Sequence, residues 1–405
     1  MAQNGDQYRG LVLGRDVYVV DAVRTPIGKL GGGLAGVRPD DLGALVIRAL
    51  VERNPALDPA RVGEVCFGAA NQAGEDNRNV ARMSSLLAGL PTSVPGSTVN
   101  RLCASGLDAV ASAARTIAVG DASVCIAGGV ESMTRAPWVL PKAERPYPAG
   151  DATLASTTLG WRLVNPEMPD VWTVSLGAAT EGLGEKYAVT RAAADAFAAR
   201  SQRLAARAWE AGVHDRTVVQ VPGAFLARDE GIRDGVTAET LAGLKPVFRE
   251  DGTVTAGNAS QLSDGAAALL LVDEDVLREL DTEPLARITA TGADAVDPQL
   301  FGIGPVQAVR RALASAGRGL ADVTTMELNE AFATQALACL SEWPELDPDV
   351  VNPYGGAIAI GHPLGCSGAR LAGAVAHQLA AAGSGVGVAT LCIGVGQGLA
   401  MVMER

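Results

Sequence analysis

The stretch V-N-R-L-C-A-S-G-L-D-A-V, residues 99–110, places a lone cysteine, Cys103, between an apolar lead-in and a helix start rich in small residues. Unpaired backbone N–H groups and the positive end of the dipole at a helix N-terminus favour a thiolate, which makes Cys103 a candidate nucleophile. A lone cysteine is more often a small buried hydrophobic residue. The stretch alone therefore leaves both interpretations open.

The surroundings of Cys103 recur near the C-terminus. The pattern predicts a strand before the cysteine turn, a helix after it and a second strand closing with V-C-I-A-G-G. From residue 361, G-H-P-L-G-C-S-G-A-R is followed by a helix, a glycine turn and the strand L-C-I-G-V-G. The two blocks align by their S-G pairs at 105–106 and 367–368. This order predicts an internal duplication of one α/β half, with a ligand crevice between the halves.

The composition agrees with a layered α/β protein. At 405 residues the chain is long enough for two or three domains. Hydrophobic residues make up 48% and aromatic residues only 4%, so Ala, Val, Leu and Ile must fill the core. The formal net charge of −12 argues against a nucleic-acid partner, because phosphate binding needs clustered Lys and Arg.

Cysteine spacing and hydropathy indicate the compartment. The six cysteines include no C-x-x-C pair, so neither a disulfide scaffold nor a metal site is expected. Residues 1–10 lack the basic and then apolar pattern of an export signal. The long uncharged run 371–401 is interrupted by glycines, which predicts a helix, a turn and a strand instead of a membrane span. We therefore expect a cytoplasmic protein.

Residues 134–259 differ in composition from the rest of the chain. They begin with a proline-rich stretch, carry four of the five tryptophans and contain one strongly predicted helix, from Thr190 to Ala211. We interpret this segment as an inserted lid. The expected domains are residues 1–133 with 260–282, the lid 134–259, and a second half over 283–405.

Three further polar positions lie in small-residue sequence in the second half. Asn329 follows a predicted strand in L-N-E-A-F-A, and His362 lies between Gly361 and Pro363 in a rigid turn. Cys392 ends a strand, and Gly394 just after it leaves a backbone N–H approachable. A nucleophilic thiol needs a base, for which His362 is the best placed of three histidines. A second thiol suits the transfer of a carbon-bound proton, as in carbon–carbon chemistry on a thioester.

These blocks resemble the signatures of the thiolases, coenzyme A-dependent acyltransferases that cleave or form 3-oxoacyl-CoA. The similar blocks are C-A-S-G, N-E-A-F, G-H-P and C-I-G, and the resemblance extends through A-N-Q-A-G-E-D-N-R-N-V-A-R, G-G-V-E-S-M, G-T-V-T-A-G-N-A-S and N-P-Y-G-G-A-I-A-I-G-H-P-L-G. It covers nearly the whole chain. It implies a thiolase fold, with two duplicated α/β halves of five-stranded mixed sheets in α-β-α-β-α layers and an inserted lid.

The resemblance also implies a role for each polar position. Cys103 would take the acyl group, and His362 would activate Cys103 and help to hold the thioester oxygen. Asn329 would position a water in that first oxyanion pocket, while the backbone N–H groups of Cys103 and Gly394 would form a second one. Cys392 would exchange the α-proton of acetyl-CoA. No permanently bound cofactor or metal is implied, since coenzyme A and acetyl-CoA enter as substrates.

Further positions are implied for substrate binding. Ser260 resembles the family's contact to the pantetheine arm, and Arg233 and Thr240 fall where the nucleotide is usually contacted. The remaining implied residues line the acyl pocket and are Ala331, Phe332 and Leu176, the last standing where methionine is common. The stretch L-G-W-R-L-V-N-P, residues 159–166, resembles thiolases acting on 3-oxoadipyl-CoA. Acetoacetyl-CoA and longer 3-oxoacyl-CoA substrates remain open.

Other functions and the assembly stay open at this level. The alternatives are a ketoacyl-synthase-like condensing enzyme, which would take acyl carrier protein, a thiolase-like acyl-CoA or lipid-binding protein without catalysis, and a cysteine hydrolase. A condensing enzyme of that kind would not use Cys392 as a base, and a cysteine hydrolase would give Cys392 no role. A binding protein without catalysis would be expected to lack one of the catalytic groups. The resemblance implies a homodimer or a homotetramer.

Overall fold

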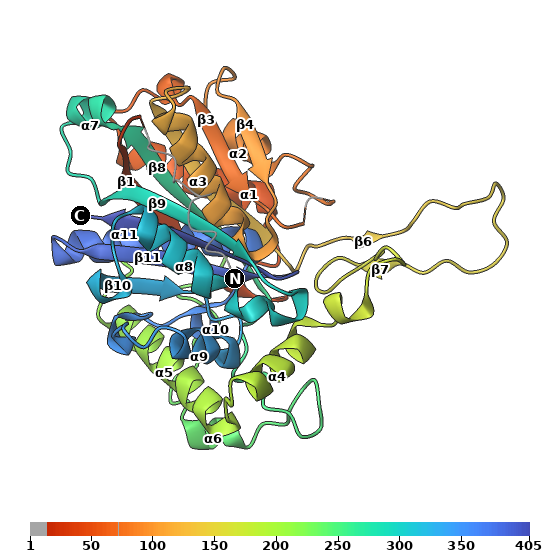
Figure 1. Ribbon diagram of the computed structural model, residues 1–405. Coiled ribbons are helices and arrows are strands. Elements are labelled where there is room, and N and C mark those ends of the chain that lie inside the picture. Colours follow the sequence, from red (N-terminus) through yellow and green to blue (C-terminus); the bar gives the residue numbers. More distant parts are fainter. Residues whose placement is uncertain (1–13, 72) are drawn as a thin grey trace, which may run out of the picture.

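The computed structural model describes residues 14–71 and 73–405, which form the layered body and projecting lid of Figure 1. The stretch in which no export signal is expected lies outside the described residues, as does Gln72 of the block A-N-Q-A-G-E-D-N-R-N-V-A-R. Within the described part, no helix has both the length and the apolarity to cross a membrane.

The first half of the chain forms a mixed sheet in the order β4-β3-β5-β8-β1. The strands β3, β4 and β5 run parallel, whereas β8 is antiparallel to both of its neighbours. The elements of this half are β1 (Val17–Arg24), β2 (Gly28–Lys29), α1 (Pro39–Arg53), β3 (Glu64–Gly68), α2 (Val80–Leu87), β4 (Gly96–Val99), α3 (Ser105–Ala118), β5 (Val124–Ser132), β8 (Ser263–Asp273) and α7 (Glu274–Leu280).

The second half repeats this topology, in the order β10-β11-β12-β9. A single parallel bridge from Met326 to Val351 takes the edge position that β4 has in the first half. The elements of this half are β9 (Ala286–Ala295), α8 (Gly304–Ser315), β10 (Val323–Leu328), α9 (Ala333–Ser341), α10 (Ala357–Ile360), α11 (Leu364–Ala382), β11 (Val386–Ile393) and β12 (Gln397–Glu404). The predicted duplication is therefore confirmed.

The two sheets are not separate, which corrects the expectation of two five-stranded sheets. Val17–Val19 of β1 pair with Ala286–Ile288 of β9 in antiparallel register. With β2 paired to β8, the strands form one ten-stranded sheet. The physical reason is that β1 and β9 are each the first strand and the outer edge of their half, and pairing satisfies backbone groups that an exposed edge would leave open.

Three apolar cores nevertheless separate the expected five layers. Helices α3 and α11 lie between the halves and share a central core with the inner faces of both parts of the sheet. The helices α1 and α2 cover the outer face of the first half, and α8 and α9 cover that of the second. Along β5, Cys125 and Ala127 face the central core while Val124 and Ile126 face the outer one. Burial on both faces explains why these strands read as continuous apolar runs.

Small residues let α3 and α11 meet backbone to backbone. A Cβ on Gly106 would lie 2.5 Å from the carbonyl oxygen of Gly365, and one on Gly368 would overlap the backbone of Leu107. The S-G pairs that aligned the two blocks thus mark the contact between the central helices. This contact brings the turn before α3 against the turn before α11.

The segment expected to form a lid, residues 134–259, packs partly on this body and partly projects from it. Its elements are β6 (Trp138–Val139), β7 (Ala155–Ser156), α4 (Leu176–Lys186), α5 (Arg191–Glu210) and α6 (Ala238–Ala242). The hairpin of β6 and β7 projects far beyond the layers, whereas α4, α5 and α6 lie beside the second half (Figure 1). The predicted helix after Thr190 is confirmed, with the Thr190 side chain accepting from the N–H of Ala193 at its start.

Candidate active site

Cys103 lies in a 3₁₀ turn, Leu102–Ala104, directly before α3. Its side chain is 7% exposed, the largest fraction among the six cysteines. Burial raises the pKa of the thiol to about 11, while the backbone amides of Gly394 and of Cys103 itself act in the opposite direction. The structure therefore brings Gly394 close to Cys103, with the backbone amides of both residues beside the candidate nucleophile.

His362 is held by hydrogen bonds to its backbone and to its ring. Its backbone N–H donates to Ser263 Oγ at 3.1 Å, and its Nδ1 lies 2.6 Å from Ser367 Oγ. The single hydroxyl hydrogen of Ser367 is donated to the carbonyl oxygen of Pro363 at 2.8 Å, so Ser367 accepts from His362 and Nδ1 carries the proton. The other ring nitrogen, Nε2, is therefore unprotonated and can act as a base.

Asn329 faces that second ring nitrogen. Its Nδ2 lies 3.4 Å from His362 Nε2, in the donor geometry that the tautomer requires. The side chain is fully buried, and Oδ1 has no hydrogen-bond partner within the described residues. A buried polar atom without a partner is costly unless water or a ligand binds it. The structure thus places Asn329 and His362 together, with an acceptor available for a bound water.

Cys392 closes the site at the end of β11. It is 1% exposed, and its pKa is raised well above the ordinary value by burial and then by the neighbouring Cys103. Its apolar neighbours are Leu176, Ala179, Phe301, Ala331 and Phe332. The three residues expected to line the acyl pocket therefore gather around this second thiol.

The loop after β3 and the start of α11 are tied together by a carboxylate that the sequence interpretation did not single out. Glu131, at the end of β5, accepts from the N–H groups of Ala70, Asn71 and Gly365 at 2.8 to 3.1 Å. Burial raises its pKa to about 7. Its motif G-G-V-E-S-M was noted as part of the resemblance, and a charged residue in such an apolar strand was the available signal. Ser367 was likewise visible, as the partner of Ser105 in the aligned S-G pairs.

The residues expected to bind coenzyme A divide into two groups. Ser260 donates its N–H to the carbonyl oxygen of Ala331, which places it beside the acyl pocket. Thr240 and Thr237 instead form a reciprocal capping box that starts α6, so the Thr240 hydroxyl has a structural use. Arg233 lines a separate cavity of about 540 Å³ with Arg203 and Arg207. The structure does not bring Arg233 or Thr240 into the cluster around the two cysteines.

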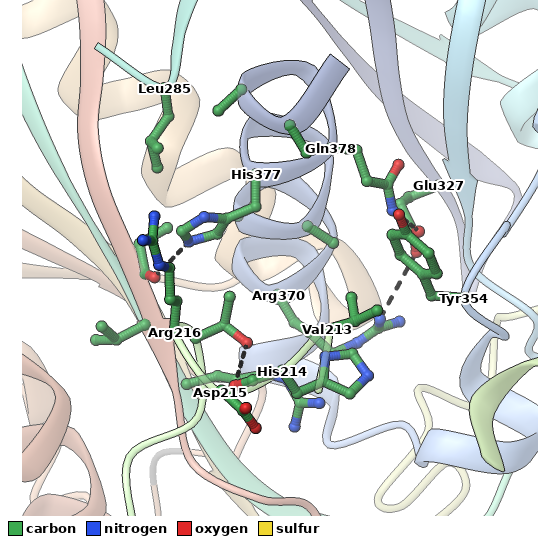
Figure 2. A pocket seen from close by; sticks show the side chains of 18 of the residues that line it. Val213, His214, Asp215, Arg216, Leu285, Glu327, Tyr354, Arg370, His377 and Gln378 are labelled. Atoms are coloured by element: carbon green, nitrogen blue, oxygen red, sulfur yellow. Dashed lines mark hydrogen bonds and ion pairs between the residues drawn. The ribbon is translucent and has the colours of Figure 1, made fainter. Parts of the chain in front are cut away.

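A second cavity lies behind α11, away from the cysteines (Figure 2). Its volume is about 540 Å³, and none of Cys103, Asn329, His362 and Cys392 lines it. At its wall Arg370 lies 3.7 Å from Glu327, and both side chains are almost fully buried. Burial raises the pKa of Glu327 to about 7 in spite of Arg370. The two side chains form a long ion pair, and the groups expected to carry the chemistry lie elsewhere.

Removing one partner of this buried pair should destabilise the fold. We expect Arg370→Met to lower the free energy of unfolding by about 3 to 5 kcal/mol, because it leaves the Glu327 carboxylate buried without a counter-charge. A raised carboxyl pKa means that the folded state favours the protonated form, so the loss should grow as pH rises through about 7. Denaturant unfolding at several pH values measures this loss in the free energy of unfolding. The double variant Arg370→Met/Glu327→Gln should recover part of the loss; equal losses in both variants would show that the pair is uncoupled.

The protonation states of the site make a further prediction. The pKa of His362 is lowered to about 3 by burial and by Arg370, and that of Cys103 is raised to about 11. At neutral pH the resting site therefore holds a thiol and a neutral imidazole. We expect the rate of Cys103 alkylation by iodoacetamide, followed by mass spectrometry, to rise about tenfold per pH unit through the neutral range. A rate that stays constant there would instead reveal a preformed thiolate and imidazolium pair.

Family comparison agrees with this geometry. The N-terminal domain model of the thiolases matches residues 17–275, and the C-terminal domain model matches residues 282–405. The chain therefore belongs to the thiolase family. It is accordingly an acyltransferase, and the suspected resemblance is confirmed.

Particular relatives are similar over their full length. A beta-ketoadipyl-CoA thiolase of Pseudomonas putida is 52% identical over 96% of this chain and 100% of its own. A 3-oxoadipyl-CoA/3-oxo-5,6-dehydrosuberyl-CoA thiolase of Escherichia coli K12 is 49% identical over 96% of this chain and 100% of its own. The crystal structure of human mitochondrial 3-ketoacyl-CoA thiolase in complex with CoA has a TM-score of 0.91 and 35% identity, over 97% of this chain and 98% of that one.

Proposed function

We propose that this thiolase cleaves 3-oxoadipyl-CoA with coenzyme A to give succinyl-CoA and acetyl-CoA, through an acyl group carried by Cys103. The observation that carries the chemistry is that Gly394 and Cys392 both lie close to Cys103, while His362 pairs with Asn329 at the turn before the helix that packs on α3. The named activities of the full-length relatives support the substrate.

The first step forms a bond from the Cys103 sulfur to the 3-oxo carbon. The thiol proton of Cys103 passes to Nε2 of His362, which is unprotonated because the Ser367 contact holds the ring proton on Nδ1. The backbone N–H groups of Cys103 and Gly394 stabilise the oxyanion on that carbon, and such donors typically contribute about 3 to 4 kcal/mol each to the barrier. The burial of both side chains removes water that would compete for these donors.

The second step breaks the bond between the 2 and 3 carbons. Cys392 gives its proton to the departing acetyl-CoA enolate, whose oxygen is held by protonated His362 and by a water on Asn329. Coenzyme A then gives its thiol proton to the Cys392 thiolate and attacks the acyl group on Cys103, which releases the shortened acyl-CoA. His362 returns its proton to the Cys103 sulfur, so both cysteines end as thiols. In the reverse direction Cys392 deprotonates acetyl-CoA for condensation.

A comparison of substrates tests the proposal. Thiolysis of 3-oxoadipyl-CoA, acetoacetyl-CoA and 3-oxohexanoyl-CoA should be followed side by side, the last having the same chain length without the distal carboxylate. We expect the highest kcat/KM for 3-oxoadipyl-CoA. A clear preference for acetoacetyl-CoA would exclude the dicarboxylate substrate, and no cleavage of any of the three would exclude the reaction.

We also propose a cytoplasmic homodimer or homotetramer. The projecting β6–β7 hairpin carries apolar side chains that the body does not cover, and the exposed fractions of Trp138 and Tyr147 are 68% and 97%. The strand β4 is the outer strand of the sheet. Both features favour association with further copies. Light scattering coupled to gel filtration should show a defined oligomer, and a monomer at micromolar concentration would contradict it.

A further inference from the structure

Trp161 reaches from the lid onto the peptide that serves Cys103. Its Cη2 and Cζ2 atoms lie 3.0 and 3.4 Å from the point where a Cβ on Gly394 would be. Leu102, the residue before Cys103, meets the same point at 3.5 Å. The six-membered ring of the indole therefore packs directly over Gly394, whose backbone amide lies close enough to Cys103 to lower the pKa of its thiol.

The indole is held in this position by the chain that leads to the acyl pocket. Trp161 Nε1 donates to the carbonyl oxygen of Val174 at 3.3 Å. The next residue, Ser175, caps α4 by accepting from the N–H of Ala178. Helix α4 begins with Leu176, which packs in the cluster around Cys392. One continuous piece of the lid thus presents Trp161 near the first thiol and Leu176 near the second.

The neighbours of Trp161 do not share its contact. Leu159, Leu163 and Val164 are 61%, 65% and 41% exposed, whereas Trp161 is only partly exposed. The indole is therefore the apolar side chain of this stretch that turns toward the site, and part of its surface stays open. A large flat side chain in this position limits the space beside Cys103 and offers a surface for a short chain.

We propose that Trp161 is a wall of the acyl pocket and determines the acyl selectivity of the enzyme. The indole contacts the carbons beyond the 3-oxo group and blocks long apolar chains. A short chain ends at the exposed edge of the lid, where a distal carboxylate stays hydrated. The favoured substrates are short 3-oxoacyl-CoA thioesters, including those with a polar end, so the inference rests on the proposed function and deepens it.

Two substitutions test the role. Trp161→Ala opens the pocket, and Trp161→Phe keeps an aromatic wall. For Trp161→Ala we expect kcat/KM for 3-oxodecanoyl-CoA relative to acetoacetyl-CoA to rise about tenfold or more, in line with the selectivity that hydrophobic pockets provide. In the same variant kcat/KM for 3-oxoadipyl-CoA should fall about tenfold, mostly through a higher KM, because an apolar contact is lost. Trp161→Phe should keep the ratios within about threefold of the unmodified enzyme.

Trp172→Ala is the matched control. Trp172 belongs to the same lid segment and is 41% exposed. The Trp172→Ala variant should leave kcat/KM for 3-oxodecanoyl-CoA and for 3-oxoadipyl-CoA unchanged relative to acetoacetyl-CoA. Thermal unfolding of each variant separates a local change from loss of the fold. Equal changes for all three substrates would overturn the proposal, since they would mean that Trp161 only supports the Gly394 peptide; unchanged ratios would overturn it as well. If the unmodified enzyme prefers acetoacetyl-CoA, the proposed substrate fails, while the ratio of long to short chains still tests Trp161.

Discussion

Replacement of Cys103 by alanine should abolish the acyl-enzyme and lower the rate of thiolysis by about 10⁴-fold or more. The effect is large because no other group among the residues gathered at the site can carry the acyl chain at that position. The backbone amides of Cys103 and Gly394 would then lie beside a methyl group. Mass spectrometry of the protein after incubation with acetyl-CoA measures the adduct directly.

Cys66→Ala is the control for this prediction. Cys66 is also buried in the central core, and burial raises its pKa to about 11, the same value as for Cys103. Cys66 lies in β3 and not in the turn before α3, and Gly394 is not among the groups that influence the pKa of its thiol. We expect the Cys66 variant to form the adduct normally, which would show that position and not thiol acidity selects the nucleophile. An adduct on Cys103→Ala would remove Cys103 from the mechanism.

Replacement of Cys392 by alanine should separate the two halves of the reaction. Cys103 should still take an acetyl group from acetyl-CoA, because its own donors and His362 are unchanged. Carbon–carbon bond formation and cleavage should fall by about 10³- to 10⁴-fold, toward the upper end for a lost general acid or base. The exchange of the α-protons of acetyl-CoA with deuterated water, followed by NMR, should be lost as well.

Cys339→Ala serves as the matched control. Cys339 is fully buried and donates to the carbonyl oxygen of Gly302 at 3.1 Å, close enough to Cys392 to influence its charge. Its variant should keep proton exchange and thiolysis. Normal exchange in Cys392→Ala would assign the proton transfer to another group, with His362 the nearest candidate.

The lowered pKa of His362 shapes the mechanism that these variants probe. A neutral imidazole with its proton on Nδ1 accepts the Cys103 proton only as the sulfur attacks. Charge therefore develops inside a dry site, where the two backbone donors have their largest effect. The resting enzyme keeps its thiol protonated, which limits its reaction with other electrophiles.

The sequence by itself determined the α/β duplication, the candidate groups and the helix after Thr190. These features depend on turn residues, caps and apolar periodicity within short stretches, and such local patterns can be read without a partner. The family motifs extended the interpretation to Ser260 and to the residues around Cys392. The position of Thr240, reached by counting back along the chain, stays a prediction, and its hydroxyl takes part in the capping box of α6.

Only the tertiary structure decided how these pieces meet. Glu131 joins Gly365 across 234 residues, Ser367 sets the tautomer of His362, and Trp161 lies on Gly394. The pairing of β1 with β9 likewise joined two expected sheets into one. The physical reason is that these contacts follow from the close packing of α3 on α11 and from the way the lid folds back. Both are set by the shapes of distant surfaces, which no local pattern encodes.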